Sequence, residues 1–155
     1  MQYRYPITET HLKDNEDIQI KGYNIHTKNR QNEEGGGIAL LIRNDIYHIT
    51  ELLENPPSHE PEIMWINVKI KPEIIIGIYY GKQENTPTEQ ITNEFNILTE
   101  DINQRSHPDR NIILMGDFNA KLTFNTNQIE QTKSRNGNLL QNLLETTNMV
   151  AVKKT

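Results

Sequence analysis

The sequence predicts one mixed α/β domain, and three observations point to that class. Apolar runs with the length of β-strands recur along the 155 residues. Residues 87–105 carry apolar side chains at helical spacing and lie between apolar strands at 74–80 and 112–115. This succession of strand, helix and strand indicates a parallel crossover. The length is that of a single domain able to bury roughly two thirds of its unfolded surface.

Composition excludes several classes of protein. The chain has no cysteine, which rules out a disulfide framework and thiolate metal sites. No apolar run approaches the roughly 18 residues of a membrane span, and the first residues lack the apolar core of a signal peptide. We therefore expect an intracellular protein without a membrane partner. A net charge of −5 with dispersed lysines and arginines argues against nucleic-acid binding by charge alone, whereas a divalent cation would permit an acidic nuclease.

The chain begins with an expected strand over residues 3–8, where Pro6 requires a sheet edge or a strand end. Glu9 follows at once, and a solvated or helix-capping acid is the ordinary interpretation of such a residue. Two short extended pieces, 18–20 and 23–26, come next and are hinged at Gly22. Glu9 therefore provides a carboxylate directly after the first expected strand.

Three glycines at 35–37 lead into an apolar strand over 38–42. A phosphate cradle needs a helix N-terminus, so a permissive turn or bulge is the better interpretation. Between Asn44 and Ile49, an Asn-Asp turn is expected to lead into a further strand. That strand would pair with 38–42 as a hairpin. Residues 62–70 alternate in polarity, which predicts a half-buried antiparallel strand, with Trp65 packed under a covering helix rather than stacked on a base.

The second half of the chain contains the predicted crossover. The strand 74–80 ends at two tyrosines, for which a structural role is at least as good an interpretation as a functional one. A capping box from Thr86 opens the helix over 87–105. Residues 122–136 are polar and irregular, and they precede a short helix over 137–147 that Asn148 ends. A last strand is expected from Met149 to Val152.

The stretch NIILMGDFNAK, residues 111–121, ends a strand that we expect to be buried on both faces. Asp117 and Asn119 follow that strand. Taken alone they suit a turn, because Gly, Asp and Asn are common turn residues. They also suit chemistry on a phosphate, since ligands collect outside the carboxyl ends of central strands in α/β proteins.

Several segments together resemble the endonuclease/exonuclease/phosphatase superfamily, and most closely the apurinic-type endonuclease domain of non-LTR retrotransposons. They are, in order, ITETHL, GGGIALLIR, EIMWINVKI, IIIGIYYG, NIILMGDFNAK and RNGNLLQNLLETTNMVAV. The resemblance implies a four-layer α/β (α+β) sandwich with two mainly antiparallel β-sheets flanked by helices. It also implies hydrolysis of DNA phosphodiester bonds with Mg²⁺ or Mn²⁺, in the nucleus, beside a reverse transcriptase in a longer polyprotein.

Four residues take functional roles by this resemblance. Glu9 resembles the metal-binding glutamate of the family, and Asp117 the aspartate that deprotonates or positions the attacking water. Asn119 resembles the amide that holds the phosphate. Tyr80 resembles the phosphate-contacting tyrosine, although Lys82 and Gln83 replace the residues that follow it in the family pattern, and Tyr79 is the alternative.

The departures from the family pattern set a further expectation. No histidine occurs after His107 and no aspartate after Asp117, so the phosphate-binding histidine of the family is absent. We expect a partial sandwich that lacks the N-terminal strand and the C-terminal part of a single domain spanning 1–155, inactive in nicking as this chain alone. The alternatives are a noncatalytic remnant that binds at most metal or nucleic acid, and a lipid or small-molecule phosphodiesterase or phosphatase of the same superfamily.

Overall fold

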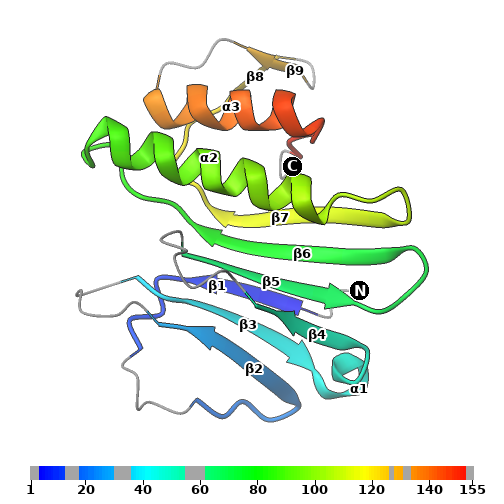
Figure 1. Ribbon diagram of the computed structural model, residues 1–155. Helices are drawn as coiled ribbons and strands as arrows, with labels where there is room; N and C mark the ends of the chain where they lie inside the picture. Colours follow the sequence, from blue (N-terminus) through cyan, green and yellow to red (C-terminus); the bar gives the residue numbers. More distant parts are fainter. Residues whose placement is uncertain are drawn as a thin grey trace. The chain divides into compact units, whose positions relative to one another are not determined.

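The computed structural model describes residues 4–12, 18–29, 36–54, 62–125, 128–130 and 134–152 (Figure 1). The chain divides into two compact units. The first comprises Met1–Tyr80 and Ser106–Asp117, and the second Gly81–Arg105 and Phe118–Thr155. The predicted α/β class with two mainly antiparallel sheets is confirmed. Two sheets lie in the first unit, and two longer helices lie in the second.

The first sheet is fully antiparallel and has the strand order β1-β3-β2. Its strands are β1 (Arg4–Thr8), β2 (Tyr23–Lys28) and β3 (Ile38–Arg43). β1 is the edge strand that Pro6 predicted, because proline has no N–H to donate to a second neighbour. The central strand β3 is apolar throughout, and Ile38 to Ile42 are all buried.

The second sheet has the order β4-β5-β6-β7. Its strands are β4 (Thr50–Leu53), β5 (Glu62–Val68), β6 (Glu73–Tyr80) and β7 (Arg110–Asp117). The pairs β4/β5 and β5/β6 are antiparallel, whereas β6 and β7 are parallel. The parallel crossover predicted from strand, helix and strand is therefore confirmed.

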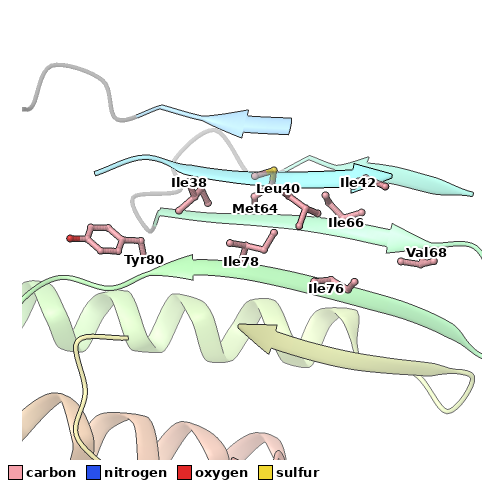
Figure 2. Close-up of a cluster of buried hydrophobic side chains, with 9 residues drawn as sticks. All are labelled: Ile38, Leu40, Ile42, Met64, Ile66, Val68, Ile76, Ile78 and Tyr80. Carbon is pink, nitrogen blue, oxygen red and sulfur yellow. The ribbon is translucent and has the colours of Figure 1, made fainter. Parts of the chain in front are cut away.

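The two sheets of the first unit face each other across a continuous apolar core, shown in Figure 2. Alternate residues of β3, β5 and β6 point into it, as the two-residue period of a strand requires. They are Ile38, Leu40, Ile42, Met64, Ile66, Val68, Ile76, Ile78 and Tyr80. Tyr80 stands at one end of the row, with its hydroxyl directed away from the aliphatic side chains.

The predicted hairpin between 38–42 and the segment up to Ile49 is wrong. Asn44–Tyr47 form the short helix α1, and the next strand, β4, pairs with β5 in the other sheet. The physical reason lies in the first sheet, because β1 and β2 already occupy both edges of β3. A chain that leaves β3 must therefore find its pairing partner elsewhere.

Burial differs from expectation in two strands and at the C-terminal end. β5 is buried on both faces rather than half-buried, and Trp65 is wholly enclosed, so it does not stack on a ligand. β7 is less buried than predicted, with Ile113 42% exposed, because it is the edge of its sheet among the described strands. Met149 to Val152 form no strand, and Val150 is largely exposed.

The second unit contains α2 (Thr88–Arg105) and α3 (Arg135–Thr147), which pack against each other. On α2 the buried apolar residues are those that the helical spacing predicted, namely Ile91, Phe95, Leu98 and Ile102. The helix α3 begins after Ser134, whose hydroxyl accepts the Gly137 N–H at 3.0 Å. It ends at Asn148 in the left-handed conformation, as predicted.

The stretch 122–136 is less irregular than predicted. It contains a two-stranded antiparallel ladder of β8 (Thr123–Asn125) and β9 (Gln128–Glu130), and α3 starts before its end. Strands of three residues are too short to show a polarity period, which is why the sequence did not reveal them. Within the described ranges, no helix is both long and apolar enough to cross a membrane.

Candidate functional site

Tyr80 and Glu9 are brought into direct contact, although they lie 71 positions apart in the chain. The Tyr80 hydroxyl donates a hydrogen bond of 2.5 Å to Oε1 of Glu9. Tyr80 is only 7% exposed, and its ring belongs to the apolar core, so its hydroxyl needs a polar partner at the rim of that core. Glu9 is exposed, and it supplies this partner directly after β1 ends.

The backbone around Glu9 is held by the glycines before β3. Glu9 and His11 have positive φ angles of 56° and 52°, which side chains other than glycine rarely adopt. The N–H of Thr10 donates to the carbonyl of Gly37 at 3.2 Å, and that of His11 to the carbonyl of Gly36 at 2.9 Å. Gly36 and Gly37 thus lead into β3 and support the segment 9–11, while Gly35 lies outside the described residues.

Asp117 ends β7 in parallel register with Tyr80 at the end of β6. Both strands run in the same direction, so their carboxyl ends lie at one edge of the second sheet. Gly116 precedes Asp117 with a φ of 135°, and a Cβ there would lie 1.9 Å from the Tyr79 carbonyl oxygen. Glycine is therefore required for β7 to approach β6 directly before Asp117.

Asn119 lies in the second unit and is held at both its backbone and its side chain. Its Nδ2 donates to the Gly81 carbonyl at 2.7 Å, and its own carbonyl accepts a bond from Nδ2 of Asn136 at 3.1 Å. Its φ of 45° is left-handed, which asparagine tolerates better than most residues. Asp117 is the last residue of β7, and the left-handed backbone follows two residues later at Asn119. The catalytic roles of Glu9, Tyr80, Asp117 and Asn119 stay predictions.

Asn136 is a buried polar residue whose role the sequence did not reveal. It is 0% exposed, and its Nδ2 also donates to the Lys82 carbonyl at 3.0 Å, so it joins the segments that contain Lys82 and Asn119. Its backbone N–H donates to the Glu84 carboxylate at 2.9 Å. That hydrogen bond is the largest cause of the lowered pKa of Glu84. Hydrogen bonds from Ser134 and Arg135 and the positive charge of Arg135 also lower this pKa, whereas burial raises it. The only sequence signal was a polar RNGN run before an amphipathic helix.

The donor groups of the first unit suit a hard divalent ion that keeps most of its water. Carboxylates stand at the ends of β1 and β7, in Glu9 and Asp117, and Glu9 is oriented by the Tyr80 hydroxyl. In the part of the chain that the structure describes, no group of three or more His, Asp or Glu side chains gathers. Mg²⁺ is typically bound by one or two carboxylates together with water and substrate phosphates, so the chemistry of a single carboxylate such as Glu9 is compatible with such an ion, whereas it does not form an all-protein cage.

Comparison with known proteins identifies the family. The sequence profile of the Endonuclease/Exonuclease/phosphatase family matches residues 7–147. No curated protein sequence matches the chain. Among solved structures, a crystal structure of humanized D. rerio TDP2 with 14 mutations is similar, with a TM-score of 0.45 and 13% sequence identity over 63% of this chain. The chain spans 40% of the length of that protein. Because the family profile covers most of its residues, the chain belongs to the endonuclease/exonuclease/phosphatase family.

Proposed function

We propose that this chain contributes to the divalent-metal-dependent hydrolysis of DNA phosphodiester bonds, as the endonuclease domain of a non-LTR retrotransposon that nicks target DNA. The observation that supports this best is the hydrogen bond from Tyr80 to Glu9, with Asp117 in register beside Tyr80. The hydrogen bond joins Glu9, the proposed metal ligand, to Tyr80, the proposed phosphate contact. Family members generally use divalent metals.

Each residue has a distinct role in this proposal. Glu9 supplies an oxygen ligand, and the Tyr80 hydroxyl keeps the Glu9 carboxylate oriented. Asp117, when ionised, accepts a proton from the attacking water, a contribution of about two to four orders of magnitude in rate. Asn119 donates to a phosphate oxygen without adding negative charge. A bound Mg²⁺ or Mn²⁺ would stabilise negative charge on the scissile phosphate.

DNA is the proposed substrate because the strand GGGIALLIR resembles the retrotransposon branch of the superfamily rather than its lipid or small-molecule phosphatases. A net charge of −5 means that metal ions, more than basic side chains, must offset the phosphate charge. We accordingly propose a nuclear location and a reverse transcriptase as the associated activity. With no histidine after His107, the chain alone should nick DNA weakly or not at all.

A titration with Mn²⁺ tests the metal site. Wild-type protein should bind Mn²⁺, and Glu9→Gln should weaken binding by about tenfold or more, because it removes a charged oxygen ligand. Glu51→Gln is the matched control, since Glu51 is an exposed strand glutamate paired with Lys69. Binding that is indifferent to Glu9 would remove the site assignment and favour a noncatalytic remnant.

A nicking assay on supercoiled plasmid with Mg²⁺ tests the activity of the chain as it stands. We expect at most slow nicking that is sensitive to Asp117→Ala. Robust nicking abolished by Asp117→Ala would contradict the expected inactivity while supporting the site. Release of phosphate from lipid or small-molecule phosphoesters, with no action on DNA, would instead support the phosphatase alternative.

A further inference from the structure

We infer that Glu62 is a positioning residue: it holds the segment Glu9–His11 in place and, through it, the carboxylate of Glu9. Glu62 is the first residue of β5 and belongs to the sheet opposite the one that carries Glu9. The importance of Glu9 for metal binding rests on the proposed function, whereas the positioning itself does not.

The first step is the hydrogen bond between the two sheets at Gly37. The Gly37 N–H donates to Oε1 of Glu62 at 2.8 Å. Gly37 is buried and lies immediately before β3, with a φ of 85° that only glycine adopts readily. A glycine segment needs external contacts to stay in one conformation, because glycine loses more backbone freedom on folding than other residues. Glu62 supplies such a contact.

The second step carries this restraint from Gly36 and Gly37 to the segment that contains Glu9. The carbonyls of Gly36 and Gly37 accept the N–H groups of His11 and Thr10. A Cβ on Gly37 would lie only 2.5 Å from Oγ1 of Thr10, so the two segments are in close contact. Displacement of Gly37 would therefore displace Thr10, which is bonded directly to Glu9.

The third step concerns the other side of the same segment. Glu62 and Tyr80 are cross-strand partners in β5 and β6. Tyr80 binds the Glu9 side chain, and Glu62 binds Gly37, whose carbonyl accepts the N–H of the residue after Glu9. Two adjacent residues of the second sheet thus restrain one loop of the first sheet at two points. A third bond between the sheets at this end runs from Lys28 Nζ to the Ile63 carbonyl at 3.2 Å.

The test measures amide hydrogen exchange by NMR in the whole chain. Removing the acceptor in Glu62→Ala should speed exchange of the Thr10 and His11 amides by roughly tenfold, the equilibrium equivalent of about one ordinary hydrogen bond. Glu62→Gln keeps an oxygen acceptor and should restore protection. Amides of the buried core strand β5 serve as the reference for global opening. If Glu62→Ala does not fold, Glu62→Met makes the same comparison, because it retains the stem of the side chain without an acceptor.

The matched control is Glu73→Ala. Glu73 also begins a strand and also accepts a hydrogen bond, from Arg110 Nε at 2.9 Å, but it lies at the opposite end of β6 from Tyr80. It should leave Thr10 and His11 unchanged. Unchanged amide exchange in Glu62→Ala would overturn the inference. Exchange accelerated equally in Glu62→Gln would also overturn it, because it would show that the charge of Glu62 matters rather than its oxygen acceptor.

Mn²⁺ titration of the same variants separates this inference from the proposed function. The dissociation constant should rise about tenfold in Glu62→Ala and stay near the wild-type value in Glu62→Gln and Glu73→Ala. Wild-type protein that binds no Mn²⁺ would refute the proposed metal site, while the exchange data would still decide the role of Glu62. Equal Mn²⁺ affinity in wild type and Glu62→Ala would overturn the link from Glu62 to the Glu9 carboxylate.

Discussion

Gly116→Ala should destabilise the first unit because the added methyl group meets the backbone of the neighbouring strand. Gly116 lies in β7 immediately before Asp117 and pairs with Tyr79 of β6. Its Cβ would lie 1.9 Å from the Tyr79 carbonyl oxygen, far inside the 3.4 Å at which ordinary contact begins. The obstructing atom is backbone, so no side chain can turn aside to make room.

Two contributions set the size of the effect. A φ of 135° is unfavourable for alanine, and a strained backbone conformation of this kind costs about 1–3 kcal/mol. The contact with Tyr79 must be relieved by moving β7 away from β6, and each backbone hydrogen bond lost in the process costs about 1 kcal/mol net. The free energy of unfolding should therefore fall by about 3 kcal/mol, which lowers the Tm by roughly 6–12 °C for a chain of this size.

Urea unfolding of wild type and variant measures this change, and Gly22→Ala isolates the backbone contribution. Gly22 has a φ of 88°, but nothing lies within 4 Å of its Cβ position. It should lose only about 1 kcal/mol. If Gly116→Ala were no less stable than Gly22→Ala, the close approach of β6 and β7 would be refuted, and with it the argument that glycine is needed to place Asp117.

Three further predictions concern other parts of the chain. Ser134→Ala should destabilise α3 by about 1 kcal/mol in urea unfolding, because Ser134 accepts the Gly137 N–H, whereas Ser134→Thr should retain most of that stability. Ile66→Ala should lower the free energy of unfolding by about 2–5 kcal/mol because Ile66 is fully buried. Ile70 is 41% exposed, so Ile70→Ala should lower it by no more than about 1 kcal/mol, and equal losses in the two variants would contradict the described core. The pKa of Glu84 is lowered from 4.5, so its ionised form stabilises the folded protein above that pH, and this contribution is lost as the pH falls through the lowered value. The stability difference between wild type and Glu84→Gln should therefore shrink on acidification, and a difference that grows would contradict the hydrogen bond from Asn136.

Local patterns in the sequence were sufficient for most elements and for the family. The apolar stripe on α2, the end of α3 at Asn148 and the edge position of β1 each follow from properties of neighbouring residues. The family match agrees with the resemblance that the segments from ITETHL to RNGNLLQNLLETTNMVAV carry in the sequence. Strand ends also marked Glu9 and Tyr80 as polar groups worth attention, because a change from apolar to polar residues is visible in the sequence itself.

The tertiary structure decided which of these residues meet and which faces are covered. It assigned β4 to the second sheet, exposed one side of β7, and joined Tyr80 to Glu9 and Glu62 to Gly37. The periodicity of a sequence shows only which face of a helix or strand is apolar and which is polar. What lies against that face depends on pairing between segments separated by tens of residues, and a single sequence carries no local signal for such pairing.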